Sequence, residues 1–297
     1  MDRLDIDEAL VRSLLHEQHP DLAGGDLRLM AGGWDNQLWR LGEELAVRLP
    51  LTPRAPSLLR NEQQWLPVLA PRFPLPVPAP VRIGVPSERF PRPWTIARWV
   101  PGVPGDRAAI SRADHAANAL AGFLGALHEK APAGAPTSAN RGVPLTALAD
   151  DFEQRFRAVA SSGIAAEVRR IWADAVAAPG RQGAPVWIHG DLHPANVVVS
   201  DGTLSGVIDF GDLCVGDPAT DLAAAWLLLP AGSASRFFGA YARADEATIR
   251  RARGWAVLRG VSLIGIGQAW EQGLPGGQPT WGRAGRAALD RLMASGG

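Results

Sequence analysis

The strongest constraint on the fold is one stretch of the sequence, between residues 186 and 212. It reads Val-Trp-Ile-His-Gly-Asp-Leu-His-Pro-Ala-Asn from Val186 and ends Val-Ile-Asp-Phe-Gly-Asp at Asp212. Two apolar runs between these pieces flank Asp201 and Gly202, and Asp-Gly between strand-like runs is a strong hairpin signal. The stretch therefore predicts a strand, a polar loop, and a two-stranded hairpin that leads to Asp-Phe-Gly.

Four side chains of this stretch, those of His189, Asp191, Asn196 and Asp209, form a pattern that phosphoryl transfer requires. This chemistry needs positioning and charge neutralisation more than covalent catalysis. Asp191 has the spacing of a carboxylate that orients an attacking hydroxyl, and Asn196 and Asp209 can supply oxygen ligands to a metal. Two protein ligands match Mg²⁺, which also binds substrate phosphates. We expect Asp191 to be catalytic and Asn196 and Asp209 to bind Mg²⁺.

The charges of the chain are balanced, which limits its partners. The first hundred residues contain 12 basic and 12 acidic side chains, and the rest contain 18 of each. There is no basic stripe of the kind that nucleic-acid binding requires. A polycationic substrate is usually met by an acidic patch, and the composition gives no support for one.

The length and the single cysteine indicate a globular intracellular protein. The 297 residues, of which 46% are hydrophobic, suffice for two lobes. Cys214 cannot form an intramolecular disulfide, which fits a reducing compartment. The N-terminus lacks a signal-peptide core, and the longest apolar run, 223–229, is too short for a membrane span. We expect a cytoplasmic protein without membrane contact, as a monomer or homodimer.

Periodicity divides the chain into a mainly β part followed by a mainly helical part. The Pro/Gly cluster at 101–105 is the best domain boundary, and the Pro-rich stretch 71–80 is not expected to be helical. Ser111 and Asp114 have capping-box spacing at a helix start. Helices are predicted at 6–17, 57–69, 111–129, 145–160, 165–177, 218–229, 233–242, 246–271 and 281–293. Strands are predicted at 27–31, 36–40, 45–49, 94–100, 186–189, 196–199 and 204–210.

The motif His189-Gly-Asp-Leu-His-Pro-Ala-Asn196 followed by Ile-Asp-Phe at 208–210 resembles the aminoglycoside phosphotransferase-like and choline kinase-like small-molecule kinases. Gly190, where protein kinases favour Arg, points to the small-molecule branch. The resemblance implies an α+β, protein-kinase-like bilobal fold. Its parts would be a small β-rich nucleotide-binding lobe at 1–100, a hinge at 101–105 and a larger, mainly helical catalytic lobe at 106–297. It also implies γ-phosphate transfer from ATP or GTP to a hydroxyl of a small molecule, with Mg²⁺.

The same resemblance assigns nucleotide contacts in the N-terminal part. The loop 31–36, with Gly33, would cover the phosphates, although a tight hairpin is an equal alternative. Arg48 stands where the family has a phosphate-binding Lys, in a chain with one Lys and 29 Arg. Glu62 would pair with Arg48, or else be a solvated helix carboxylate. Arg98 and Val100 would offer backbone groups to the base.

The resemblance also implies roles for residues in two further segments. Asp221 would hold the backbone of the catalytic loop from the start of a helix. Alternatively, Asp217 caps that helix with Pro218 at its first position, and both roles can hold. The acceptor site is the least defined part. Its candidates are Asp150, Asp151, Glu153, Trp270 and Glu271, and acidic residues at a helix start are more often partners of the helix dipole.

Two other interpretations of the sequence remain. A protein kinase is disfavoured by Gly190 and by the short path from Asp209 to Asp217, which leaves little room for an activation loop. A catalytically silent nucleotide-binding module is favoured by Arg48 and the irregular glycine loop, and disfavoured by the intact catalytic triplet. Within the enzyme interpretation, antibiotic resistance and ordinary metabolism are both open.

Overall fold

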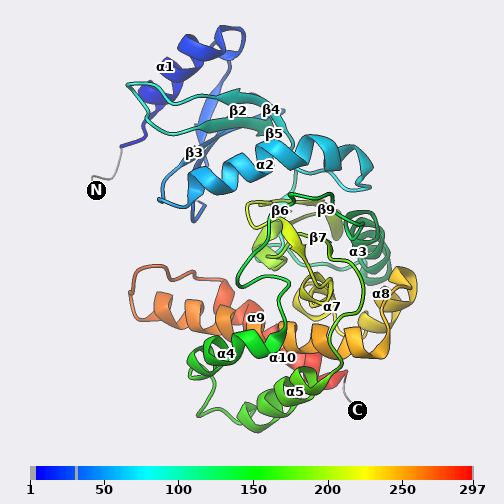
Figure 1. The fold of residues 1–297 in the computed structure, drawn as a ribbon. Helices are drawn as coiled ribbons and strands as arrows, with labels where there is room; N and C mark the ends of the chain where they lie inside the picture. Colours follow the sequence, from blue (N-terminus) through cyan, green and yellow to red (C-terminus); the bar gives the residue numbers. More distant parts are fainter. Residues whose placement is uncertain (1–4, 31–32, 296–297) are drawn as a thin grey trace. The chain divides into compact units, whose positions relative to one another are not determined.

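The computed structural model describes residues 5–30 and 33–295, and Ala31 and Gly32 of the expected phosphate loop lie outside these ranges. The chain forms two compact units (Figure 1). Unit 1 contains Met1–Pro101 together with Ile208–Gly211, and unit 2 contains Gly102–Val207 together with Asp212–Gly297. The four residues that return to unit 1 include Asp209, so the expected metal ligands Asn196 and Asp209 belong to different units.

Unit 1 is a five-stranded antiparallel sheet with helices, in the strand order β1-β2-β3-β5-β4. Its core is apolar and joins α1 to the sheet through side chains such as Leu14, Val47 and Trp94, which are fully buried. Asp7 begins α1 by accepting a hydrogen bond from the Leu10 N–H at 2.8 Å, a side-chain N-cap. The elements are α1 (Glu8–Gln18), η1 (Pro20–Leu22), β1 (Leu27–Leu29), β2 (Asn36–Leu41), β3 (Leu45–Pro50), α2 (Ala55–Leu69), η2 (Ala70–Arg72), β4 (Pro80–Gly84) and β5 (Trp94–Arg98).

Unit 2 contains two small sheets and a set of helices. One sheet has the order β6-β8-β9 and the other pairs β7 with β10. The strands are β6 (Val103–Pro104), β7 (Val186–Ile188), β8 (Val197–Ser200), β9 (Thr203–Val207) and β10 (Cys214–Gly216). The helices are α3 (Ala113–Leu127), η3 (Leu145–Leu148), α4 (Ala149–Phe156), α5 (Ala165–Ala177), η4 (Pro194–Asn196), α6 (Ala219–Leu222), α7 (Ala224–Leu227), α8 (Ala234–Tyr241), α9 (Glu246–Glu271) and α10 (Trp281–Ala294).

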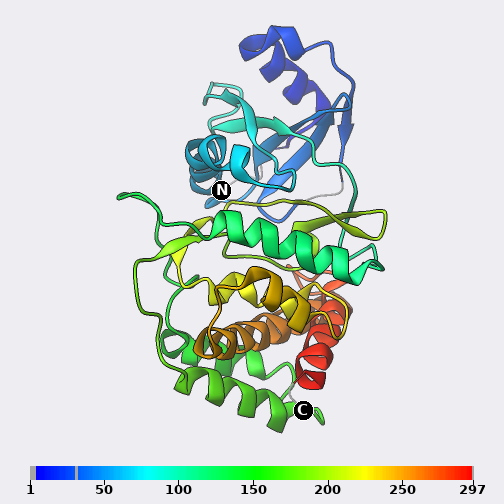
Figure 2. The ribbon, with the colours of Figure 1, turned by 90° about the vertical axis from the view of Figure 1, so that its right-hand side faces the viewer.

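The long helix α9 organises unit 2, because it packs against α10, α5, α6 and α4 (Figure 2). Small residues allow α9 and α10 to approach closely. A Cβ at Gly285 would lie 2.5 Å from the Gly260 carbonyl oxygen, which no side chain tolerates. This packing buries α9 on most sides, so any charged side chain that it places inside unit 2 needs a partner.

The predicted hairpin is confirmed, and its turn has the geometry that Asp-Gly favours. Asp201 and Gly202 both have positive φ, at 50° and 72°, as a two-residue hairpin turn with both central residues left-handed requires. Val197 pairs with Val207 at the open end of the hairpin. The last residue of β9 therefore lies beside the first residue of β8, where the polar loop ends.

Several predicted elements differ from the structure. The helix predicted at 218–229 is divided into α6 and α7, because the Trp226 N–H bonds to the Ala223 carbonyl three residues back and tightens the turn. The capping box at Ser111 is absent: the N–H groups of Ser111 and Arg112 donate to the Gly202 carbonyl, and no side chain caps α3. The first difference comes from a local backbone bond, and the second from a backbone partner in a distant turn.

Other differences concern short elements. The helix predicted at 145–160 begins as the 3₁₀ helix η3, continues as α4 and ends at Phe156. The Pro-rich stretch includes a 3₁₀ turn at Ala70–Arg72, with Pro71 near its start, and its last residue begins β4. The strands β4, β6 and β10 were not predicted, since all three are short or interrupted by Pro and Gly. Among the helices of residues 5–30 and 33–295, none has the length and apolarity of a membrane span.

Candidate active site

The loop after β7 is held by one buried aspartate, Asp221, at the start of unit 2's short helix α6. Asp221 is fully buried, and its carboxylate accepts the N–H of His189 at 2.7 Å and the N–H of Gly190 at 2.9 Å. His128 Nε2 lies 3.2 Å from the same carboxylate, and His128 Nδ1 lies 2.8 Å from the Tyr241 hydroxyl. The prediction that Asp221 holds this loop is confirmed, and the buried network fixes the backbone that presents Asp191.

Gly190 is required by the shape of this loop. Its φ is +81°, a left-handed conformation that side chains disfavour. A Cβ at this position would also lie 2.9 Å from the Asp212 carbonyl oxygen. The glycine that separates this sequence from the protein-kinase pattern is thus a steric necessity here.

Asp217 has the capping role that the sequence suggested and a second role, an ion pair, that the sequence did not suggest. Its Oδ1 accepts the Ala219 N–H at 3.0 Å at the start of α6. Its Oδ2 also accepts a hydrogen bond from Arg251 Nε at 2.6 Å, and both side chains are nearly buried. The segment around α6 is therefore anchored to α9 by an ion pair.

Asn196 is oriented by Asp191. The Asn196 Nδ2 donates to the Asp191 backbone carbonyl at 2.9 Å and to Asp191 Oδ2 at 3.2 Å. Because both contacts use the amide nitrogen, the amide oxygen Oδ1 remains as a possible metal ligand. An amide oxygen is a donor that Mg²⁺ accepts, so Asn196 fits its expected role. Residues 5–30 and 33–295 contain no group of three His, Cys, Asp or Glu that could hold a metal by itself.

Two arginines contact the Asp191 carboxylate. Arg259 Nη2, from α9, lies 2.7 Å from Asp191 Oδ1 and donates to the Gly190 carbonyl at 2.7 Å. Arg141 Nη2 lies 3.3 Å from Asp191 Oδ1 and 3.0 Å from Asp212 Oδ2. Burial acts to raise the pKa of Asp191, but Arg259, His193 and Arg141 outweigh it and hold this pKa well below its usual value. Burial, and secondarily Arg141, lower the pKa of Arg259 to about 10.

His193 has a structural environment. It is 5% exposed, its ring meets Trp281 edge-on at 4.6 Å between centroids, and its Nε2 lies 3.6 Å from Asp191 Oδ2. A histidine so enclosed packs the loop.

In unit 1, Arg48 on β3 and Glu62 on α2 form a buried ion pair. Glu62 is 1% exposed, which rules out a solvated helix carboxylate. Burial acts to lower the pKa of Arg48, but the carboxylates of Glu62 and Asp209 outweigh it, so this pKa is raised. Burial raises the pKa of Glu62, against the attraction of Arg48. Arg48 is therefore a fixed cation with two carboxylates acting on it.

Asp209, also in unit 1, has an unusual backbone. Its φ is +63°, a left-handed conformation that costs energy for a residue with a side chain. The flanking segment is held in unit 1, since Asn61 Nδ2 donates to the Gly211 carbonyl at 3.3 Å and the Phe210 ring stacks on Phe73. Such an outlier, supported by its surroundings, marks a candidate functional residue.

The remaining nucleotide-contact candidates of unit 1 are Gly33, Arg98 and Val100. The loop after Gly33 is organised by Asp35, whose carboxylate accepts hydrogen bonds from Thr52 at 2.6 Å and Arg54 at 2.6 Å. The Arg98 N–H donates to the Ala79 carbonyl at 3.0 Å, so of its backbone groups only the carbonyl remains for a ligand. Val100 is buried at 7% exposure.

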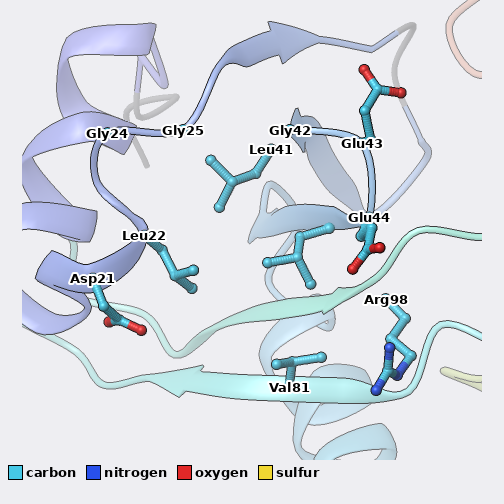
Figure 3. A pocket seen from close by; sticks show the side chains of 11 residues that line it. Asp21, Leu22, Gly24, Gly25, Leu41, Gly42, Glu43, Glu44, Val81 and Arg98 are labelled. Carbon is cyan, nitrogen blue, oxygen red and sulfur yellow. The ribbon is translucent and has the colours of Figure 1, made fainter.

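The side chain of Arg98 lines a separate cavity of about 500 Å³ in unit 1. Figure 3 shows Leu22, Leu41 and Val81 facing this cavity, with Glu44 and Arg98 at one end. An apolar floor with charged groups at the edge is typical of small pockets. The side chain of Arg98 therefore lines this cavity, whereas the role expected for this residue was a contact between its backbone and the nucleotide base.

The acceptor candidates from the sequence are largely neutralised by arginines. Asp151 pairs with Arg155 at 2.8 Å, and Glu153 pairs with Arg169 at 2.6 Å. Trp270 is 55% exposed rather than part of the core, and Glu271 lies 4.0 Å from Arg286. None of these residues has a contact with Asp191 among the interactions of the described residues.

The sequence analysis missed Arg141 and Arg259, the two arginines that contact the Asp191 carboxylate in unit 2. The signal for Arg259 was its place as the one charged residue in the apolar run 255–264. A charge inside such a run is buried with a partner or a function. Arg141 lies in an irregular segment and gave no comparable signal.

Comparisons with known proteins identify the family and the fold. The sequence matches the phosphotransferase enzyme family over residues 26–260. The structure resembles that of APH(2")-IIia, solved as a GDP and kanamycin complex, with TM-score 0.67 and 22% identity over 97% of this chain and 99% of that chain. It also resembles macrolide 2'-phosphotransferase MphH from Brachybacterium faecium, with TM-score 0.61 and 25% identity over 96% and 98% of the two chains. A search of curated protein sequences found no match.

A bilobal fold of this kind, with a braced His-Gly-Asp loop in unit 2, is that of a protein-kinase-like phosphotransferase. The chain belongs to the phosphotransferase enzyme family, whose model covers 235 of its 297 residues. The predicted family and fold class are confirmed.

Proposed function

We propose that this chain is a small-molecule kinase that moves the γ-phosphoryl group of ATP or GTP to a hydroxyl group. The observation that supports this most is the environment of Asp191: an ionised carboxylate on a loop that Asp221 fixes through two backbone N–H groups. Phosphoryl transfer depends on such positioning. The acceptor oxygen bonds to the γ-phosphorus, the bond to the bridging oxygen breaks, and the nucleoside diphosphate leaves.

In this proposal Asp191 orients the acceptor hydroxyl and receives its proton, which then passes to solvent. Asn196 and Asp209 hold Mg²⁺, which supplies charge neutralisation on the phosphates when it is bound. The free Oδ1 of Asn196 and the left-handed backbone of Asp209 support these assignments.

The nucleotide is proposed to bind through unit 1. Arg48 contacts its phosphates, and Glu62 fixes the Arg48 guanidinium through their buried pair. Gly33 lies in the loop over the phosphates, and the backbones of Arg98 and Val100 meet the base. Arginine keeps the charge of the usual lysine and can contact phosphate with two N–H groups.

The acceptor is an antibiotic or a metabolite. Solved structures of similar fold bind kanamycin, streptomycin or gentamicin, and others are macrolide phosphotransferases. The single cysteine fits the cytoplasm, where both kinds of acceptor and the nucleotides occur.

The test is a phosphorylation screen with purified protein, Mg²⁺ and either ATP or GTP. Aminoglycosides, macrolides, amino alcohols, sugars and hydroxy acids are offered, and the products are measured by mass spectrometry. We expect one class to gain a single phosphate in a Mg²⁺-dependent reaction. Nucleotide binding without transfer to any of these acceptors would support the silent-module interpretation instead.

A further inference from the structure

Two guanidinium groups lie against the Asp191 carboxylate in unit 2. Arg259 and Arg141, which we call the arginine pair, both contact Asp191 Oδ1, at 2.7 Å and 3.3 Å. Arg141 has a second carboxylate partner, Asp212 at 3.0 Å, so the charges of these four side chains balance. Of the two arginines, Arg259 has the single carboxylate contact.

The arginine pair also has more hydrogen-bond donors than unit 2 satisfies. The protein acceptors are the carbonyls of Asn140 and Gly190 and the carboxylates of Asp191 and Asp212. Arg259 uses Nη2 alone, and its Nε and Nη1 have no hydrogen-bond partner in the part of the chain that the structure describes. A guanidinium presents its N–H groups as a planar fork that matches a carboxylate. Arg259 thus has donors available for an anionic ligand.

Both arginines are held in position before any ligand arrives. Arg259 extends from α9 and is 16% exposed. Arg141 precedes Gly142, whose N–H donates to Thr220 Oγ1 at 3.2 Å and whose carbonyl accepts the Asp217 N–H at 3.0 Å. A fixed, partly desolvated pair of cations is a preorganised anion site, because little ordering is lost on binding.

The arginine pair also occupies the oxygen that the acceptor needs. Asp191 Oδ1 accepts a hydrogen bond from Arg141 and lies 2.7 Å from Arg259 Nη2, and Asp191 Oδ2 accepts from Asn196. A hydroxyl that approaches Oδ1 has to compete with one of the two arginines. An acceptor with its own carboxylate offers Arg259 a replacement partner, so that Oδ1 becomes free for the hydroxyl.

Two of the three acidic side chains of α4 have arginine partners, since Asp151 pairs with Arg155 and Glu153 pairs with Arg169. Arg155 also acts on Arg259, since it contributes to the lowered pKa of that guanidinium. An ammonium group at Asp151 or Glu153 would have to share the carboxylate with an arginine.

We propose that the acceptor is a small hydroxy acid whose carboxylate binds the arginine pair, through Arg259 first, while its hydroxyl takes the place of Arg259 at Asp191 Oδ1. This rests on the proposed function and names the substrate class for the same site. It makes Arg259 a specificity-determining residue and disfavours polycationic acceptors.

The test compares three probes of similar size: glycerate, glycerol and the cationic amino alcohol serinol. Calorimetry measures their binding to the full chain with Mg²⁺ and a non-hydrolysable ATP or GTP analogue. We expect glycerate to bind about tenfold tighter than the other two, as charge-assisted contacts predict. Glycerol 3-phosphate is a fourth probe, and its tighter binding than glycerate would overturn the assignment to carboxylates.

Three variants make the test specific. Arg259→Gln should weaken the binding of glycerate about tenfold and should not weaken that of glycerol, whereas Arg259→Lys should restore part of the difference. Arg250→Gln is the matched control on the same helix, because Arg250 pairs with Asp174 instead of Asp191. Equal binding of glycerate to the wild type and Arg259→Gln, no binding of glycerate, or preferred binding of serinol would each overturn the proposal.

The outcome is distinguishable from a failure of the proposed function. Transfer of phosphate to kanamycin but not to hydroxy acids would preserve the kinase and overturn the substrate class. Arg259-dependent binding of glycerate without transfer to any hydroxyl would preserve the anion site and overturn the kinase.

Discussion

Unit 1 and unit 2 each contain a buried contact between arginine and carboxylate, but the balance of charge differs. In unit 1 one guanidinium, Arg48, is acted on by two carboxylates, Glu62 and Asp209. In unit 2 two guanidiniums, Arg141 and Arg259, contact Asp191, and Arg141 also contacts Asp212. The excess of carboxylate in unit 1 suits a metal cation, and the unused N–H groups of Arg259 in unit 2 suit an anion.

This difference also explains how an arginine and a carboxylate can have different roles in the two units. A buried ion pair gains little stability over an apolar pair, yet removing one partner costs much, because the other charge stays buried. Glu62 therefore keeps Arg48 in place, whereas Arg259 keeps Asp191 ionised and contacts its Oδ1. The pair of Arg48 and Glu62 stabilises the position of Arg48, and the contact of Arg259 with Asp191 is one that a substrate must displace.

The largest expected effect is that of Asp191→Asn. The amide cannot receive a proton, so kcat/KM should fall about 10³-fold, within the range for a positioned acid or base. Steady-state kinetics with the acceptor found in the screen measure this. Asp174→Asn, on an exposed aspartate of α5, is the control, and a loss of less than about tenfold in Asp191→Asn would remove Asp191 from the mechanism.

The next effect is that of Glu62→Gln in unit 1. The change leaves the Arg48 guanidinium buried beside a neutral group, and the free energy of unfolding should fall by about 3 kcal/mol. Urea denaturation measures the loss, and the KM for nucleotide should rise with it. A stable variant with an unchanged KM would show that Arg48 does not depend on Glu62 and would break the comparison between the units.

A smaller effect concerns pH. The pKa of Asp191 is depressed, so its contribution to stability is full above its unfolded value of about 3.9 and is lost as pH falls through the folded pKa. The same carboxylate should stay ionised and active down to about pH 5 in the wild type. In Arg259→Gln the pKa rises, so the acid limb of the profile of kcat/KM against pH should move to higher pH. An unmoved limb would mean that Arg259 does not control the ionisation of Asp191.

The smallest effect is expected for Arg250→Gln. Arg250 and Asp174 form a pair with side chains 30% and 47% exposed, and exposed pairs contribute about 0–1 kcal/mol. Unfolding in urea should show a change within that range and no change in the pH profile. A larger loss would indicate that position on α9, rather than contact with Asp191, determines the effect of Arg259→Gln.

The sequence predicted the parts of the site that depend on local order. The loop from His189 to Asn196 and the hairpin turn at Asp201 follow from residues that are neighbours in the chain. The resemblance implied Glu62 as the partner of Arg48, and the two residues lie 14 positions apart in the chain. These contacts are encoded by short spacing and by residue type.

The missed parts depend on segments far apart in the chain. Arg141 lies 50 residues before Asp191 in the chain and still contacts it. Arg259 follows Asp191 in the chain and contacts it from a helix that was predicted only by its periodicity. The cap expected at Ser111 failed for the same reason, because the Gly202 carbonyl took its place. Periodicity predicts where a helix lies in the sequence, but it does not predict which distant loop the helix contacts.

The return of Ile208–Gly211 to unit 1 has a consequence for synthesis of the chain on the ribosome. Residues 1–101 leave the ribosome early, but the segment that includes Asp209 and Phe210 follows only after a large part of unit 2. Domains tend to fold in order as they emerge, and unit 1 cannot finish in that order. Its sheet can form first, while its last four residues arrive from a hairpin that belongs to the other unit.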